Sequence, residues 1–255
     1  MKFLYIIIFF ILGTCMGSFY TVVGLRLPKK EKFLTGRSHC DACGHDLSLL
    51  DMVPVLSFLF LRGKCHYCKE KIDSLSTYME IFTGILYALA YYAFGFSGSF
   101  VIALGIISML VILSVSDIKY YTIPDEIIIF FAGYFTIANT MIEGIIPALL
   151  HIGSGLILFA FMYGIMLLGN LIFKKETLGG GDIKLMFDIG LVLNPFLGIV
   201  VIFIASFLAL PISFLILWKQ KQNLVPFGPF LLTGFLFLYF TKIDMQMIID
   251  FIKSF

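Results

Sequence analysis

Two acidic residues stand beside apolar stretches, where a membrane-type chain tolerates few charges. Asp182 follows three glycines, and Asp117 closes an apolar stretch of its own. A carboxylate at the centre of a bilayer costs at least about 2.5–3.5 kcal/mol, so an acid at this depth is a functional candidate. Two carboxylates about 3 Å apart share a proton and titrate as a unit. Such a pair can hydrolyse a peptide bond, with the ionised member acting as base and the neutral member as acid.

Further residues are candidates to support this pair. Gly179 and Gly181 permit close backbone approach and unusual dihedrals beside an extended substrate, although a flexible turn also explains them. Lys184 either holds down the charge of the pair or extends to the membrane surface. Glu80 is either a site residue or a partner of a helix N-terminus. Asp188 is an alternative to Asp182 that ranks lower, because no glycine bend precedes it.

The second group of residues that could do chemistry consists of cysteines. Two Cys-x2-Cys pairs are separated by 21 residues, and their members are Cys40, Cys43, Cys65 and Cys68. Paired knuckles of this kind favour tetrahedral zinc, and a redox-active or metal-free state is the alternative. Because four cysteines complete a tetrahedral site, the neighbouring His39, His45 and His66 are expected at the surface. Cys15 lies in an apolar stretch and is expected to serve packing alone.

The elements that must position these residues are membrane helices. The chain is 60% hydrophobic and 13% charged, with a mean hydropathy of +1.02, outside the range of a soluble globular domain. Several apolar stretches reach the roughly 20 residues that span a bilayer. The predicted crossings are Phe3–Leu25, Tyr78–Phe96, Phe100–Val115, Ile127–Ile142, Ile145–Phe173, the short Ile183–Leu193, Phe196–Trp218 and Phe227–Phe240. This pattern predicts an all-α polytopic membrane protein with eight crossings, or seven as the alternative.

The polar segments predict how the chain is oriented. With eight crossings, the segments around 26–76, 117–125, 174–184 and 219–226 share one side and hold 15 of the 18 Lys and Arg residues. The positive-inside rule assigns this side to the cytosol, which leaves both termini outside. The same parity brings Asp117 and Asp182 to one face. The first apolar run is too long for a signal peptide, so it is expected to remain in the mature protein.

Three domains are predicted along the chain: a first transmembrane helix over 1–28, a cytosolic four-cysteine loop domain over 29–76, and a transmembrane aspartyl peptidase core over 77–255. Within the loop, the apolar stretch Met52–Leu61 is too short to span a membrane. It predicts a strand or a helix lying in the membrane interface.

The order of the motifs resembles one known family, the type IV prepilin peptidases, which combine a leader peptidase with an N-methyltransferase. Asp117 with Ile123-Pro124 is similar to the first catalytic motif of the family. Gly179-x-Gly181-Asp182-x-Lys184 is similar to its GxGD motif, which presenilin-like intramembrane proteases share more loosely. Other matching stretches are Gly17-Ser18-Phe19, Arg26-Leu27-Pro28, the segment from Arg37 to His45, Asp51–Pro54, Leu61–Cys65, Glu80–Gly84 and Val225–Phe230.

The resemblance implies an activity, partners and a location. It implies cleavage of the basic leader of type IV prepilins or pseudopilins after a glycine, at the cytosolic side of the inner or cytoplasmic membrane. It also implies methylation of the new N-terminal residue from S-adenosylmethionine, although residues 26–76 contain no glycine-rich nucleotide fingerprint. Membrane lipid is an expected partner, and nucleic acid is not.

Two other classes of protein fit parts of the pattern. A proton-coupled transporter would use Asp117 and Asp182 as a relay, since acids within membranes also mark ion pathways. A membrane anchor would assemble pilus machinery through its cysteine loop without doing chemistry. A peptidase shortens its substrate, whereas a transporter produces flux and no new protein termini.

Overall fold

The computed structural model describes residues 2–33, 38–40, 42–48, 50–174, 178–220 and 225–243, without the side chains of 215–220. The described residues form helices and contain no strand, only two isolated bridges at His39–Asp46 and Lys64–Lys71. The predicted all-α class with a small cysteine module is therefore confirmed. Predictions that concern Arg37, Lys175, Lys221 and the C-terminal end of the chain lie outside the described residues.

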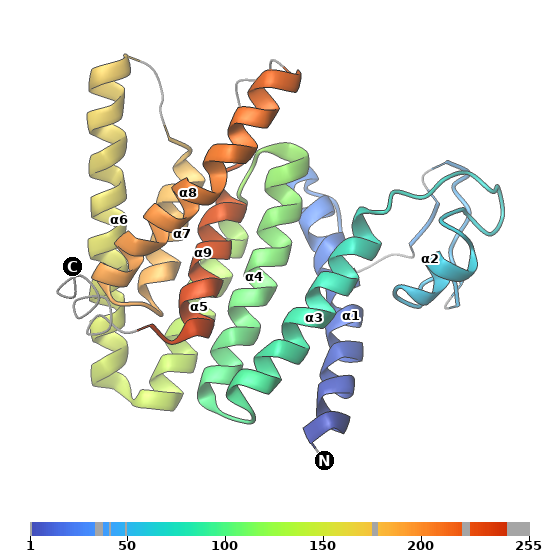
Figure 1. Cartoon of the computed structure of the whole chain (residues 1–255), viewed down its shortest axis with the longest axis horizontal. Helices are drawn as coiled ribbons and strands as arrows, with labels where there is room; N and C mark the ends of the chain where they lie inside the picture. Colours follow the sequence, from blue (N-terminus) through green and yellow to red (C-terminus); the bar gives the residue numbers. More distant parts are fainter. Residues whose placement is uncertain are drawn as a thin grey trace. The chain divides into compact units, whose positions relative to one another are not determined.

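The chain divides into two compact units, Met1–Phe96 and Ser97–Phe255. The first contains α1 (Lys2–Arg26), the 3-10 turn η1 (Leu27–Lys29), α2 (Leu56–Phe60) and α3 (Leu75–Phe94). The second contains α4 (Gly98–Tyr120), α5 (Asp125–Glu143), α6 (Ile145–Phe173), α7 (Gly180–Gly190), α8 (Pro195–Gln220) and α9 (Gly228–Thr241), as Figure 1 shows. The predicted domain boundaries remain a prediction, and by compactness α3 groups with α1.

Each of the eight predicted apolar stretches is a helix, because a backbone in lipid must satisfy its polar groups internally. Among the described residues, five helices are long and apolar enough to cross a membrane: α1, α4, α5, α6 and α8. The chain is therefore a multi-pass membrane protein. The count of eight crossings remains a prediction, because α3, α7 and α9 do not meet the same criterion of length and hydropathy.

Small residues let α1 and α3 approach closely within the first unit. A Cβ added to Gly13 would lie 2.8 Å from the Cα of Gly84, and one added to Gly17 would lie 2.9 Å from the Cα of Glu80. Membrane helices associate by such close packing, since lipid offers no hydrophobic drive to bring them together. The contacts fix α3 against the central part of α1.

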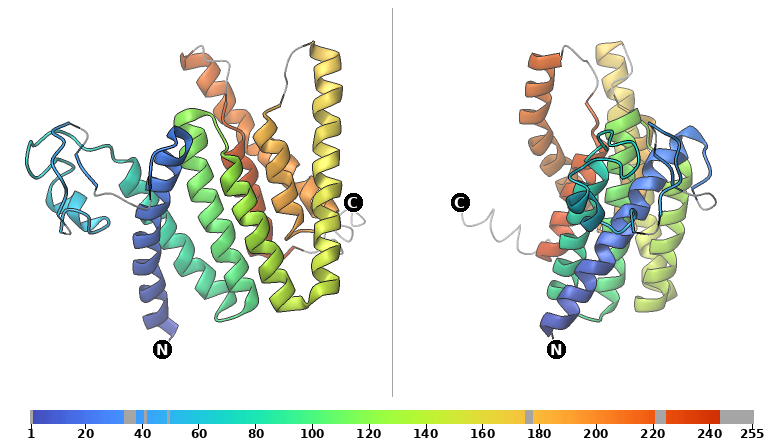
Figure 2. Two further views of the ribbon diagram at one scale, coloured as in Figure 1. Left: turned by 180° about the vertical axis from the view of Figure 1, so that it is seen from behind. Right: turned by 90° about the vertical axis from the view of Figure 1, so that its right-hand side faces the viewer.

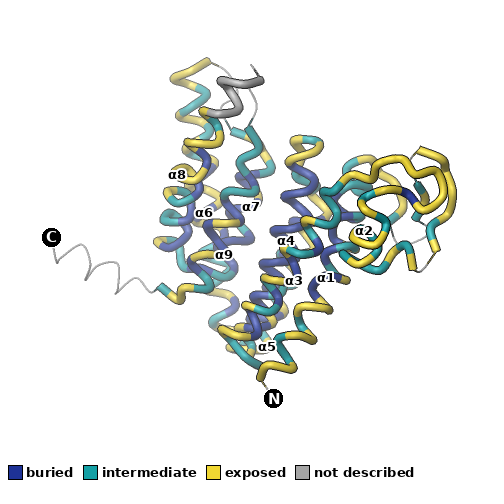
Figure 3. Tube along the Cα trace, turned by 45° about the vertical axis from the view of Figure 1, so that its right-hand side comes forward, coloured by how far each residue is buried: buried dark blue, intermediate teal, exposed yellow. Residues whose placement is uncertain are grey.

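The second unit is built around α4. In its apolar window 78% of the residues are buried, against 11% for α6, and Figure 3 shows α4 dark with buried positions. Figure 2 shows α4 and α5 side by side, and α7 packs between α5 and α6. A Cβ on Gly190 of α7 would lie 2.5 Å from the Cα of Gly155, so α6 and α7 also meet through glycines. The unit is thus joined by the packing of α7 on α5 and α6 and of α4 on α5 and α9.

Candidate active site and metal centre

The structure brings Asp117 and Asp182 together. Asp117 lies in the last turns of α4 and Asp182 in the first turn of α7, and both are buried. Gly228, at the start of α9, lies beside both of them. Its ideal Cβ position is 3.0 Å from Asp117 Oδ2 and 3.7 Å from Asp182 Oδ1, so the two oxygens are no farther apart than the sum of these distances.

The two carboxylates differ in their hydrogen bonds. The backbone N–H of Gly228 donates to Asp117 Oδ2 over 3.2 Å. Asp182 Oδ1 is buried and has no partner among the residues that the structure describes. A buried polar atom without a partner is rare in a native structure and calls for an explanation, such as a bound water molecule, an ion or a catalytic role. The pair therefore contains one carboxylate oxygen that accepts a hydrogen bond and one that does not.

The glycines of the GxGD motif provide space. At Gly181 a Cβ would lie 2.7 Å from the Cβ of Ile123, and at Gly179 it would lie 3.2 Å from Asp182 Oδ2. None of the three glycines before Asp182 has a positive φ, so the unusual dihedrals expected from the sequence are not found. Close approach, the other expected role, explains Gly179 and Gly181.

Ile123 is a neighbour of the site whose role the sequence did not show. It lies in the loop between α4 and α5, with its Cβ against Gly181 and its Cδ1 3.0 Å from the ideal Cβ of Gly228. Ser116 Oγ steadies this loop by donating to the carbonyl of Thr122 over 2.6 Å. Ile123 thus lies against the first turns of both α7 and α9. The only sequence signal for it is its place in the family motif with Pro124.

Lys184 pairs with Asp125, so the first of its two expected roles, a contact with the aspartate pair, is not seen. Its Nζ donates to both carboxylate oxygens of Asp125 at 2.7 Å, and the two side chains are 46% and 58% exposed. The pair joins α7 to the first residue of α5. Because Lys184 lies two residues after Asp182, it is rotated by about 200° around α7, away from the aspartate.

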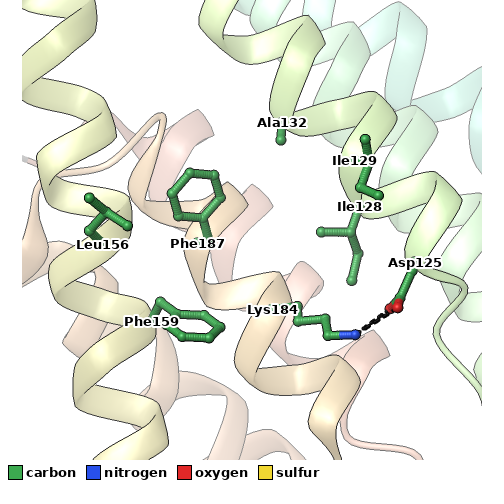
Figure 4. Close-up of a pocket in the computed structure, with 8 residues that line it drawn as sticks. All are labelled: Asp125, Ile128, Ile129, Ala132, Leu156, Phe159, Lys184 and Phe187. Atoms are coloured by element: carbon green, nitrogen blue, oxygen red, sulfur yellow. Dashed lines mark hydrogen bonds and ion pairs between the residues drawn. The ribbon is translucent and has the colours of Figure 1, made fainter.

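This ion pair borders a cavity of about 410 Å³ between α5, α6 and α7, which Figure 4 shows. Apart from the pair, the lining is apolar and consists of Ile128, Ile129, Ala132, Leu156, Phe159 and Phe187. The cavity is therefore an apolar space on the opposite side of α7 from Asp182.

Two other acids were candidates. Asp188 is fully buried, and neither of its carboxylate oxygens has a partner among the described residues. Six residues after Asp182, it faces another side of α7. Glu80 belongs to the first unit and accepts a hydrogen bond from the backbone N–H of Val55 over 2.8 Å. A role for Glu80 at the aspartate pair remains a prediction.

The four cysteines form one cluster, in which the Sγ atoms all lie within 4.8 Å of one another. The Sγ atoms of Cys40 and Cys68 are 3.9 Å apart. Tetrahedral zinc with Zn–S bonds of about 2.3 Å places its sulfurs roughly 3.8 Å apart, so the cluster fits a metal ion of this kind. Backbone N–H groups of Cys68 and Tyr67 lower the pKa of the Cys65 thiol to about 7. Despite a backbone hydrogen bond from Glu70, burial and the neighbouring thiols raise the pKa of Cys68, so Cys65 is the thiol that ionises more readily.

The two knuckles share one backbone pattern. The N–H of Cys40 donates to the carbonyl of His45 and that of Cys65 to the carbonyl of Glu70, five residues on in each case. The position four residues after the first cysteine has a positive φ in both: Gly44 and Lys69. The two turns share one hydrogen bond and one positive φ, and each directs its pair of thiols toward the same cluster.

The neighbouring histidines have other contacts. The ring of His45 lies against Tyr67, with centroids 3.7 Å apart, and His66 Nδ1 is 3.1 Å from Asp51 Oδ1. Hydrogen bonds lower the pKa of Asp51. The largest contribution comes from the side chain of Ser48, and the Ser48 backbone and His66 add to it, so Asp51 is the charged partner. The metal cluster itself contains the four cysteines and no histidine within the described part of the chain.

Fold and site together define a multi-pass membrane protein with two adjacent buried carboxylates and a separate four-cysteine module. Residues 11–94 match the bacterial peptidase A24 N-terminal domain, and residues 104–214 match the type IV leader peptidase family. The first match covers the cysteine module and the second covers both aspartates. The chain belongs to the type IV leader peptidase family.

Curated relatives span nearly the whole chain. A prepilin leader peptidase/N-methyltransferase of Bacillus subtilis is 33% identical over 91% of this chain and 92% of its own length. One of Vibrio cholerae is 30% identical over 94% and 98%. A type 4 prepilin-like proteins leader peptide-processing enzyme of Escherichia coli is 28% identical over 87% and 88%. No solved structure matches the chain. These comparisons confirm the family expected from the motifs and give no support to the transporter alternative.

Proposed function

We propose that this protein is a membrane aspartyl endopeptidase that removes the leader of type IV prepilins or pseudopilins and then methylates the new N-terminal residue. The observation that supports it best is the approach of Asp117 and Asp182 beside Gly228 in a chain of this family. Relatives that align over nearly their full length carry both activities in their names.

The hydrogen bonds favour a division of labour within the pair. Asp117 receives the Gly228 N–H, which stabilises its charged form, so it acts as the base. Asp182, whose Oδ1 is buried without a partner among the described residues, carries the shared proton and acts as the acid. Both assignments describe one arrangement of a coupled pair.

Hydrolysis then follows the chemistry of an aspartyl protease. Asp117 takes a proton from water while the water oxygen attacks the scissile carbonyl carbon, and Asp182 donates its proton to the carbonyl oxygen. When the tetrahedral intermediate collapses, the C–N bond breaks, the leaving amine takes a proton from Asp117, and one hydroxyl of the intermediate returns its proton to Asp182, which restores the pair. The space kept open by Gly179 and Gly228 allows an extended backbone to reach the pair.

The cysteine module would hold zinc through Cys40, Cys43, Cys65 and Cys68, where the ion would brace the two knuckles. S-adenosylmethionine would supply the methyl group for the second activity, and no residue is assigned to its binding. We place the four-cysteine loop domain (29–76) and the aspartate pair on the cytosolic side of the inner or cytoplasmic membrane, because of the distribution of Lys and Arg.

Replacement of each aspartate by asparagine tests the peptidase assignment. Asparagine keeps the size of the side chain but can neither carry the charge nor exchange the proton, so Asp117→Asn and Asp182→Asn are each expected to abolish cleavage. Asp188→Asn is the matched control in α7 and is expected to remain active. The measurement is the N-terminal mass of a prepilin incubated with purified protein in vesicles. Substantial cleavage by either well-folded mutant would refute the assignment.

A further inference from the structure

The short helix α2 in the loop of the first unit presents apolar side chains outward. Leu56 is 51% exposed, Leu59 62% and Phe60 82%. Phe58 instead turns inward and packs on Gly63, where an added Cβ would lie 2.9 Å from its ring. A single turn of helix therefore carries one inward aromatic residue and a compact outward apolar surface, which we call the α2 surface (Leu56, Leu59 and Phe60).

The α2 surface lies beside the membrane-spanning part of the unit. Val55, the residue before α2, donates its backbone N–H to Glu80 Oε2, and the Cα of Glu80 lies next to Gly17 of α1. Gly17 comes nine residues before Arg26, the last residue of α1, which corresponds to about 13 Å along a helix. The headgroup layer on one side of a bilayer is only about 5–7 Å thick. In Figures 1 and 2, α2 lies in the loop to the side of α1 and α3, below the level at which α1 ends.

Irregular backbone at this depth needs hydrogen-bond partners, because lipid supplies none. Val55 has a positive φ of 62° with ψ of −50°, outside the left-handed helical region, and a positive φ is a genuine outlier for a β-branched residue. Its N–H is satisfied by the buried carboxylate of Glu80. This contact also accounts for an acid inside α3, where a charge is costly unless it serves a purpose.

Basic residues follow the α2 surface directly. Arg62 and Lys64 come two and four residues after the end of α2, and neither side chain is buried. Long cationic side chains extend from an apolar surface toward headgroups, and clusters of them favour anionic lipids. The order of apolar helix and then basic residues matches the order of acyl chains and headgroups in one leaflet.

We propose that α2 is a re-entrant membrane anchor. The α2 surface inserts among the acyl chains of the leaflet at the Arg26 end of α1, and Glu80 holds the anchor there through the Val55 N–H. The occupant of this surface is lipid. The anchor would fix the cysteine module at the membrane surface, and the inference does not depend on the peptidase activity.

Tryptophan fluorescence tests this placement. The chain has a single tryptophan, Trp218, so Trp218→Phe gives a silent background for Phe60→Trp in the full-length protein. The protein is reconstituted in phosphatidylcholine/phosphatidylglycerol vesicles with or without brominated acyl chains. The tryptophan at position 60 is expected to lose most of its emission to brominated lipid and little to aqueous acrylamide. Tyr67→Trp, on the second knuckle, is the aromatic control and is expected to respond to acrylamide.

The role of Glu80 is tested in the same background. Glu80→Gln keeps an oxygen that accepts from the Val55 N–H and is expected to keep the quenching by brominated lipid. Glu80→Leu removes the acceptor and is expected to shift position 60 toward acrylamide quenching; unchanged lipid quenching in this variant would overturn the role of Glu80. Quenching of position 60 by acrylamide alone, or by neither reagent because protein covers it, would overturn the anchor.

Discussion

Gly228 offers a graded test of how tightly the aspartate pair is held. In Gly228→Ala the new methyl group would lie 3.0 Å from Asp117 Oδ2 and 3.0 Å from Ile123 Cδ1. Ordinary van der Waals contacts of a Cβ are 3.4–4 Å long, so the carboxylate must move by a few tenths of an ångström away from the Gly228 N–H. That movement weakens the hydrogen bond, now 3.2 Å long, that fixes Asp117.

The magnitude follows from the lost interaction. A hydrogen bond to a charged group contributes about 1.5–3 kcal/mol, and each 1.36 kcal/mol changes a rate about tenfold. We therefore expect Gly228→Ala to lower turnover by about 10- to 100-fold. Gly181→Ala places its Cβ 2.7 Å from the Cβ of Ile123, which forces a displacement of about 1 Å and a loss of about 100-fold or more.

Gly180 is the matched control within the same glycine run. An added Cβ there meets nothing within 4 Å, and its φ is not positive. Gly180→Ala should change turnover by no more than about twofold. The assay is the initial rate of prepilin cleavage in vesicles, with protein level and folding checked for each variant. Full turnover by Gly228→Ala, or equal damage from Gly180→Ala, would refute the view that Gly228 sets the geometry of the pair.

Two further predictions concern the cysteine module and the link between the two activities. The purified protein should contain one zinc ion per chain, and Cys40→Ser or Cys65→Ser should lose it while Cys15→Ser keeps it, as elemental analysis would show; intact thiols without metal would contradict this. Because methylation needs a free N-terminal amine, Asp182→Asn should fail to methylate full-length prepilin yet still methylate a pilin supplied already cut. Knuckle mutants should chiefly lose methylation. Absence of labelled methyl groups on pre-cut pilin with folded, zinc-loaded Asp182→Asn would show that the activities are not separable in this way.

Much of the molecule was predictable from the sequence because the signals are local. Long apolar runs predict helices in a membrane, since a lipid-exposed backbone has no other way to satisfy its polar groups. The signal for a metal cluster is also local: each Cys-x2-Cys knuckle fixes the positions of its own two thiols. The parity of the crossings predicted that Asp117 and Asp182 share a face, and the motif order predicted the family, which the comparisons confirm.

The number of crossings shows the limit of this reasoning. Apolar composition identifies α7 and α9 as helices, but with 11 and 14 residues they are too short for length alone to decide whether they cross. How a short helix sits in a membrane depends on its neighbours. For α7 these include α6, which it meets at Gly155 and Gly190.

The sequence by itself determined which residues are candidates for the chemistry, whereas only the tertiary structure decided what each of them touches. Lys184 lies two residues from Asp182, yet the turn of α7 carries it to Asp125. Glu80 binds the Val55 N–H, 25 residues away. Gly228 reaches Asp117 across 111 residues, and no local pattern encodes such a contact, because it arises when separate helices pack.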